Sequence, residues 1–124
     1  MIIGVGTDLV QIDRIRRVLD RQSQRFIERV LTPHEREVCA SKSNQAAYLA
    51  KRFAAKEAAS KALGTGIGKV SWQDFEVRNN SAGAPELHLS GEAAVRLAEL
   101  GGQRVWLTMS DERDYVTAFV VLEG

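Results

Sequence analysis

Bulky side chains alternate with glycine or aspartate along the first ten residues, which predicts a β-strand. Because successive side chains of a strand point to opposite faces, one face would carry bulky residues and the other only glycine before an aspartate. These two sets are Ile3, Val5, Thr7 and Leu9 on one face and Gly4, Gly6 and Asp8 on the other. Glycine within a strand often marks the close approach of a ligand or another backbone. We therefore expect such an approach beside Asp8.

The next part of the chain has the periodicity of helices. Ile12, Ile15 and Leu19 follow the i, i+3, i+7 spacing of a helix over residues 11–31, and Gln22-Ser23-Gln24 is expected to interrupt it. Thr32-Pro33-His34-Glu35 has the residues of a capping box with proline at the first helical position. A short helix to about Cys39 follows from this motif.

An alanine-rich segment predicts a third helix, capped by Ser43 or Asn44 and extending to Leu63. Its many small side chains would let another element pack closely against it. Gly64 suits the C′ position after the helix.

The remainder of the chain alternates between short strands and one helix. We expect strands over residues 75–78 and 87–89, a helix capped by Ser90 through Leu100, and a hairpin of residues 104–110 and 115–122. The tryptophans and phenylalanines, Trp106 among them, are expected in the core. Helices segregated from antiparallel strand pairs define an α+β fold, here as a single domain over residues 1–124.

Composition narrows the function. A chain of 124 residues that is 44% hydrophobic fits one domain with an ordinary core. Its formal charge of +1 argues against binding nucleic acid over its whole surface. No stretch approaches the roughly 20 apolar residues of a membrane span, and nothing at the start resembles an export signal. The single cysteine, Cys39, fits a reducing compartment, so we expect a cytoplasmic protein.

Two carboxylates and a lysine are the first candidates for chemistry. Asp8 lies on the bare face of the first strand, and Glu57 and Lys61 share one edge of the alanine-rich helix. Together they could hold Mg²⁺ against a phosphate, because this ion favours a few carboxylates, waters and phosphate oxygens. On spacing alone, an i, i+4 surface ion pair between Glu57 and Lys61 is the more common arrangement.

Two further features are candidates for binding. The loop Gly64–Lys69 is rich in glycine, and its backbone N–H groups could converge on an anion, but taken alone the loop is better explained as a simple glycine helix stop. The first helix carries an arginine face that suits an acidic partner but is also typical of solvated surface. This arginine face consists of Arg14, Arg17, Arg21 and Arg25, with Arg29 beyond.

Two segments resemble the holo-acyl-carrier-protein synthase family of small bacterial phosphopantetheinyl transferases. They are Gly4-Val5-Gly6-Thr7-Asp8 and the run Arg52-Phe53-Ala54-Ala55-Lys56-Glu57-Ala58-Ala59-Ser60-Lys61-Ala62-Leu63-Gly64-Thr65-Gly66-Ile67-Gly68. The resemblance covers nearly the whole chain and implies the 4′-phosphopantetheinyl transferase fold. It also implies transfer of 4′-phosphopantetheine from coenzyme A to a serine of apo acyl carrier protein, in support of fatty acid biosynthesis. Adenosine 3′,5′-bisphosphate would leave.

The resemblance also implies a set of site residues. Asp8 and Glu57 match the family's Mg²⁺ ligands, which could also take Mn²⁺, and Lys61 matches its phosphate-facing lysine. Arg52 and Gly64-Thr65-Gly66 match a region near the coenzyme. The arginine face would dock acyl carrier protein, and a homotrimer would place the sites between subunits. Some members carry histidine where this chain has Asp111, so Asp111 is not assigned to the site.

The proton acceptor and the type of activity both have alternatives. Either Glu57 or a metal-bound water would receive the proton of the carrier serine. A metal-dependent phosphate-ester hydrolase would use the same acids but release product without an acceptor. A non-catalytic module that binds an acidic partner through the arginine face would need neither the acids nor Mg²⁺.

Overall fold

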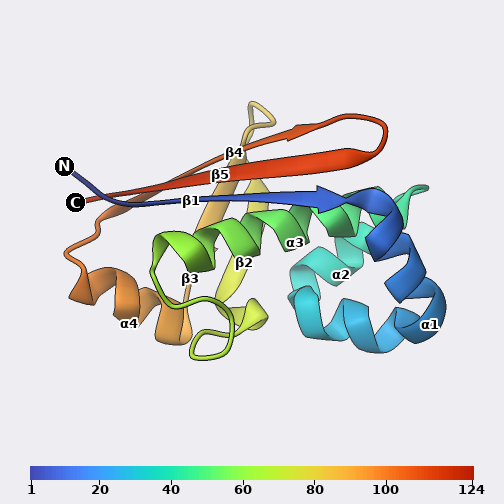
Figure 1. The fold of residues 1–124 in the computed structure, drawn as a ribbon, viewed down its shortest axis with the longest axis horizontal. Helices are drawn as coiled ribbons and strands as arrows, with labels where there is room; N and C mark the ends of the chain where they lie inside the picture. The colour runs from blue at the N-terminus through green and yellow to red at the C-terminus, as the bar shows by residue number, and fades with distance from the viewer.

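The computed structural model describes all residues 1–124 as an α+β fold built around a three-stranded antiparallel sheet. The sheet has the order β1-β5-β4, formed by β1 (Ile2–Gln11), β5 (Tyr115–Glu123) and β4 (Arg104–Asp111). Helix α3 (Gln45–Ala62) runs along one face of this sheet (Figure 1). The alanine-rich helix is thus the central element between the sheet and the rest of the chain.

The other elements gather around α3. Helices α1 (Ile12–Val30) and α2 (Pro33–Ala40) lie toward the end of the sheet where β1 finishes, and α4 (Gly91–Glu99) lies toward the opposite end (Figure 1). The 3₁₀ turn η1 (Trp72–Asp74) leads into β2 (Phe75–Asn79), which pairs antiparallel with β3 (Pro85–Leu89). The element order and the α+β class predicted from the sequence are confirmed.

Gly4 and Gly6 are the places where β1 and α3 approach most closely. A Cβ on Gly6 would lie 2.0 Å from the Ala58 carbonyl oxygen, and one on Gly4 would lie 2.4 Å from the Ala62 carbonyl oxygen. The predicted close approach on this face of the strand is confirmed, and the approaching group is the backbone of α3 in the same chain. This close contact sets the separation between the strand that carries Asp8 and the helix that carries Glu57.

Most predicted helix ends are confirmed. In α2, Thr32 Oγ1 accepts from the Glu35 N–H at 3.3 Å, and a Glu35 carboxylate oxygen accepts from the Thr32 N–H at 3.0 Å. Asn44 caps α3, and Gln22 breaks the helical geometry of α1 at φ −139° and ψ 30°. Ser90 is the N-cap residue of α4 as predicted, but its side chain makes no capping bond, and its hydroxyl donates to the Asp74 carbonyl.

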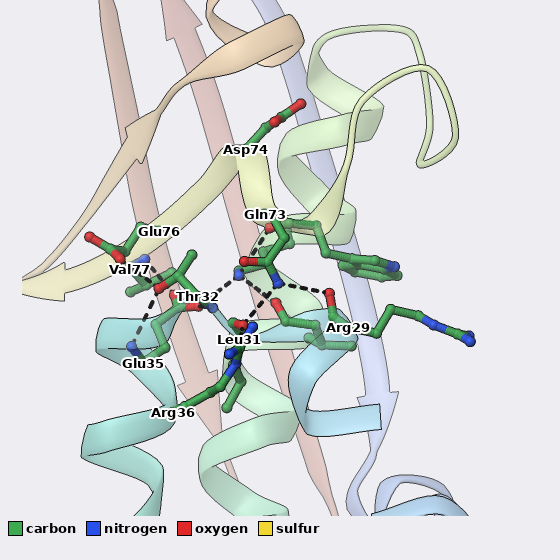
Figure 2. Close-up of polar contacts among 12 residues, drawn as sticks. Arg29, Leu31, Thr32, Glu35, Arg36, Gln73, Asp74, Glu76 and Val77 are labelled. Atoms are coloured by element: carbon green, nitrogen blue, oxygen red, sulfur yellow. Dashed lines mark hydrogen bonds and ion pairs between the residues drawn. The ribbon is translucent and has the colours of Figure 1, made fainter. Parts of the chain in front are cut away.

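The half-buried Gln73 side chain and the buried Glu35 side chain hold the end of α1 and the start of α2 against the second half of the chain. The Gln73 side-chain amide donates to the carbonyl oxygens of Glu28, Arg29 and Leu31 (Figure 2). Beside it, the capping glutamate Glu35 also accepts from the Val77 N–H at 2.7 Å (Figure 2). A capping residue of α2 therefore also anchors the strand β2.

Lys56 and Glu35 form an ion pair with no solvent exposure. The Lys56 ammonium lies 2.7 Å from Glu35 Oε1, and it donates to the Val30 carbonyl at 2.6 Å and the Trp72 carbonyl at 3.1 Å. Burial lowers the pKa of Lys56, and the neighbouring Glu35 carboxylate partly offsets this effect. All three donors of the ammonium are used, so this lysine connects α3 to α1, α2 and η1.

The sheet face opposite α3 is apolar and open. Trp106 is 55% exposed, and Val5, Leu9, Tyr115 and Phe119 are exposed on the same face. The expectation that Trp106 and Phe119 lie in the core is therefore wrong for the single chain. No helix in the structure has the length and apolar character needed to cross a lipid bilayer.

Candidate active site

Asp8 and Glu57 come from distant parts of the sequence and line one pocket. Asp8 lies near the end of β1, Glu57 lies in the fourth turn of α3, and the pocket between them and α1 has a volume of about 330 Å³. Side chains of Phe26 and Phe53 form part of its apolar wall. The sequence-predicted meeting of the two acids is what the fold produces.

Lys61 pairs with Asp8 and not with Glu57. Its ammonium lies 3.0 Å from Asp8 Oδ1 and donates to the Thr7 carbonyl oxygen at 3.1 Å. The alternative of a Glu57–Lys61 surface pair is therefore not the arrangement found. An ammonium has three donors, and the Lys61 side chain is 53% exposed. One donor remains for an anion above Asp8.

The environment of Glu57 favours its protonated form. Burial of the carboxyl raises its pKa, the nearby negative charge of Asp8 raises it further, and the positive charge of Lys61 lowers it. Two carboxylates on one pocket repel each other unless a cation lies between them. A cation between the two carboxylates would relieve the part of the shift that Asp8 causes.

The donor set fits a hard divalent cation with few protein ligands. No group of three or more histidine, cysteine, aspartate or glutamate side chains occurs that could form a closed metal cage. Zinc and calcium sites use more protein ligands, whereas Mg²⁺ keeps several waters and completes its shell with phosphate oxygens. Two oxygen donors beside an ammonium therefore suit Mg²⁺ together with a phosphorylated ligand.

The glycine loop after α3 does not form an anion-binding nest at its first residues. The Gly64 N–H donates to the Lys61 carbonyl at 3.0 Å, and the Thr65 and Gly66 N–H groups donate to the Ser60 carbonyl at 3.2 and 3.1 Å. Gly64 adopts a φ of +76°, as expected of a glycine that ends a helix. These three donors close the helix and do not converge on an external anion, in agreement with a glycine helix stop.

Side chains, and not the loop backbone, bring charge to this region. Gly64 and Thr65 line a pocket of about 690 Å³ together with two cations and two acids, whereas Gly66 is not among its lining residues. The cations are Lys69 and Arg96, and the acids are Glu92 and Glu99. Arg96 was not predicted as a site residue. Its Nε donates to the Leu63 carbonyl at 3.0 Å, so α4 places a guanidinium against the end of α3. The sequence could not identify Arg96, because α4 meets this loop only through the packing of the fold.

Arg52 lies in a different pocket, on another side of α3. Its guanidinium carbon sits 4.0 Å from the centre of the Tyr48 ring. The residue is 7% exposed, and its Nε is buried without a hydrogen-bond partner. The surrounding pocket of about 290 Å³ is also lined by Lys42 and Lys51. A buried, partly unsatisfied guanidinium beside two lysines is a setting suited to an anion.

The arginine face is open to solvent and adjoins the acid pair. None of its arginines forms an ion pair within the chain, and all are exposed. Arg14 also lines the pocket of Asp8 and Glu57. The break at Gln22 separates Arg14, Arg17 and Arg21 from Arg25. The arginine face therefore adjoins the candidate site through Arg14, its first residue.

The aromatic wall of the site was not recognised from the sequence. Phe53 stacks on Trp72 with ring centres 4.9 Å apart, and Phe26 lies 6.0 Å from Phe53. Phe53 precedes Glu57 by one helical turn, so the two side chains share a face of α3. That spacing was visible in the sequence, but the contribution of Phe26 depends on how α1 packs.

Comparisons with known proteins agree over the full length of the chain. A family model described as the 4′-phosphopantetheinyl transferase superfamily matches residues 4–120. The holo-[acyl-carrier-protein] synthase of Shewanella piezotolerans is 52% identical, with 100% of both chains covered.

Solved structures show the same likeness. The holo-[acyl-carrier-protein] synthase of Neisseria meningitidis has a TM-score of 0.93 and 46% identity, with 100% of both chains covered. The synthase of Bacillus anthracis, solved in complex with CoA (3′,5′-ADP), has a TM-score of 0.82 and 42% identity and covers 98% of this chain and 96% of its own. With the whole fold and nearly the whole sequence matched, the chain belongs to the 4′-phosphopantetheinyl transferase superfamily.

Proposed function

We propose that the protein transfers 4′-phosphopantetheine from coenzyme A to a serine of apo acyl carrier protein, releases adenosine 3′,5′-bisphosphate and so supports fatty acid biosynthesis. The observation that carries this proposal is the shared pocket of Asp8 and Glu57, with Lys61 against Asp8. Relatives at about half identity are named for this activity, which supports the same conclusion.

The reaction needs positioning and charge neutralisation more than an enzyme nucleophile. The serine oxygen forms a bond to the phosphorus that carries pantetheine, and the bond from that phosphorus to the bridging oxygen breaks. The electron pair leaves with the adenosine bisphosphate, and the serine proton must be removed. Phosphoryl-type transfer of this kind is accelerated mainly by holding the reactants in line and by balancing negative charge.

Lys61 supplies part of that positive charge. Two of its donors are held by Asp8 and by the Thr7 carbonyl, which fixes the ammonium at the end of the pocket. The remaining donor is free for an oxygen of the phosphate that leaves. Holding a lysine by a carboxylate and a carbonyl reduces the reorganisation needed when negative charge develops on the leaving oxygen.

Asp8 and Glu57 are the residues that would hold Mg²⁺, and Mn²⁺ would be accepted by the same oxygen donors. When bound, the ion supplies Lewis-acid neutralisation of the diphosphate oxygens. Repulsion by Asp8 is the second cause, after burial, of the raised pKa of Glu57, and a cation between the two carboxylates would relieve that repulsion. The Glu57 carboxylate, which lines the same pocket, is the chain's own candidate to accept the serine proton.

The arginine face would dock the carrier protein. Arg14, Arg17, Arg21 and Arg25 are exposed cations without partners in the chain, and they suit an acidic protein surface. Because Arg14 also lines the pocket of the acid pair, docking on this face would bring an acceptor serine to Asp8 and Glu57.

Arg52 would bind a second phosphate of coenzyme A. Its pocket shares no lining residue with that of the acid pair, and the two open on different sides of α3. The diphosphate must lie at the acid pair, which leaves the 3′-phosphate for Arg52. Gly64, Thr65 and Gly66 would lie near the coenzyme through the adjoining side chains, of which Arg96 and Lys69 line the same pocket as Gly64.

A homotrimer with sites between subunits would unite these separate pockets. The open apolar face with Trp106, Phe119 and Leu9 supports association, because large exposed apolar patches mark interaction surfaces. A neighbouring subunit could then bring its Arg52 pocket to the acid pair. Sedimentation should give a mass near three chains, and a monomer that still turned over would contradict a shared site.

The test of the function is a carrier-modification assay. Coenzyme A, Mg²⁺ and apo carrier are incubated with the protein, and mass spectrometry detects the phosphopantetheine added to the carrier. Release of phosphate or pantetheine without an acceptor would instead support the hydrolase. A module that only binds would retain the carrier on Glu57→Gln protein and show no dependence on Mg²⁺.

A further inference from the structure

Lys51 and Asp111 form an ion pair at the edge of the Arg52 pocket. The Lys51 ammonium lies 3.5 Å from Asp111 Oδ1, with the two side chains 33% and 48% exposed. Lys51 lies on α3 and lines the pocket that contains the buried Arg52. Asp111 ends β4 and lines a separate hollow on the open sheet face. The pair therefore connects the basic pocket to the sheet.

We propose that Lys51 is a further phosphate-binding residue of the coenzyme site and that Asp111 limits its affinity by competing for the ammonium. This inference rests on the proposed function. The Arg52 Nε is buried without a partner, so the pocket already contains a donor that an anion would satisfy. Lys51 is the adjacent cation, and Asp111 is the carboxylate with which it pairs.

Geometry favours competition over a rigid support. At 3.5 Å the pair is longer than a well-formed charge-assisted hydrogen bond, which measures about 2.7–2.9 Å. Both groups are partly exposed, and such pairs stabilise a protein weakly. A doubly charged phosphate in the pocket would therefore draw the ammonium away from Asp111 at little cost. The aspartate would in turn weaken the binding of the leaving adenosine bisphosphate, which bears the same 3′-phosphate, and favour its release.

The ligand pair that tests this proposal is coenzyme A against 3′-dephospho-coenzyme A. Lys51→Met should raise the KM for coenzyme A about tenfold, the loss expected for one charge-assisted hydrogen bond. The KM for the dephospho compound should change less than twofold. Arg113→Met is the matched control, because Arg113 is an exposed cation near Asp111 that lines none of the pockets described. It should leave the ratio of the two KM values unchanged.

Asp111→Asn should act in the opposite direction. It should tighten binding of adenosine 3′,5′-bisphosphate about two- to fivefold in calorimetry, the range of a weak exposed ion pair. In the Lys51→Met background the same substitution should have no effect, because the aspartate acts through the lysine. Weaker binding by Asp111→Asn would overturn the proposal. So would an undiminished effect in the Lys51→Met background, or an equal effect of Lys51→Met on both coenzymes.

Transfer activity and discrimination between the two coenzymes test different proposals. If the unmodified protein does not transfer phosphopantetheine to the carrier, the proposed function is wrong. If transfer occurs but Lys51→Met leaves discrimination between the two coenzymes unchanged, only the role of Lys51 and Asp111 is wrong. Thermal unfolding of each variant shows whether it folds, and calorimetry with the bisphosphate needs no turnover.

Discussion

Gly6 lies against Ala58 so closely that any side chain on the glycine would collide with the helix backbone, with a Cβ only 2.0 Å from the Ala58 carbonyl oxygen. Asp8 follows two residues later on the same face of β1, and Glu57 precedes Ala58 on α3. The contact between these two small residues therefore sets the separation of the two acids. A function that depends on the acid pair depends on this contact.

Gly6→Ala should impair both folding and transfer. Because the colliding atom is a backbone oxygen, the strand must move, and overpacking of this kind costs about 1–3 kcal/mol of unfolding free energy. The movement would displace Asp8 from Glu57, so kcat should fall more than the loss of folded protein explains. Denaturation and steady-state kinetics on the same sample measure the two effects.

Gly83→Ala provides the control for stability alone. Gly83 has a φ of +87° in the turn between β2 and β3, with open space around it. An alanine there costs roughly 1–2 kcal/mol through its left-handed backbone and should leave kcat unchanged. If both substitutions lowered kcat alike, the positioning role of Gly6 would be wrong.

Lys56→Met should be among the most destabilising single substitutions on α3. It would leave the Glu35 carboxylate buried without its cation, and breaking a buried pair in this way costs about 3–5 kcal/mol. Arg78→Met is the comparison, because the Arg78–Glu76 pair is partly exposed and such pairs contribute about 0–1 kcal/mol. Chemical denaturation measures both values, and equal losses would contradict the importance of burial.

Glu57→Gln should stabilise the metal-free protein at neutral pH. A carboxyl whose folded pKa is raised binds its proton more tightly when folded, so stability falls as pH rises through that pKa. The amide removes this penalty, which is fully present above the folded pKa and absent below the unfolded value of about 4.3. Melting in EDTA should show a higher Tm for Glu57→Gln at pH 8 and little difference near pH 4.

Glu37→Gln serves as the control for that experiment, because Glu37 is exposed on α2 and should give no comparable gain. Mg²⁺ provides the complementary result. Added Mg²⁺ should raise the Tm of the unmodified protein more than that of Glu57→Gln. A higher Tm of Glu57→Gln at every pH, or an equal response of the two proteins to Mg²⁺, would contradict the pairing of Glu57 with Asp8.

Charge reversal on the arginine face should affect the carrier and spare the coenzyme. Arg14→Glu or Arg21→Glu should raise the KM for acyl carrier protein about tenfold or more, because close like charges oppose docking. The KM for coenzyme A should change little, and added salt should weaken carrier docking in the unmodified protein. Arg104→Glu, at the far end of β4, is the control. Equal effects on both substrates would indicate misfolding or another docking surface.

Local sequence signals predicted the elements well, because each has its own chemistry. The capping box at Thr32, the interruption at Gln22 and the glycine after α3 are all written in neighbouring residues. The bare strand face before Asp8 also predicted a close approach, although only the structure shows that α3 is what approaches.

Long-range contacts were the part that sequence could not supply. Glu35 could be recognised as a capping residue, but its pairing with Lys56 depends on how α2 meets α3. Arg96 reaches the loop after α3 only because α4 packs there. Trp106 looked like a core residue because its type is usually buried, and its exposure follows from a sheet face that the single chain leaves open.

Mass spectrometry of the carrier tests the central claim most directly. The unmodified protein and Glu57→Gln are each incubated with coenzyme A and apo carrier, in Mg²⁺ and in EDTA. If Asp8 and Glu57 together form the transfer centre, the mass of phosphopantetheine appears on the carrier only with the unmodified protein in Mg²⁺. Near-normal modification by folded Glu57→Gln would contradict the claim.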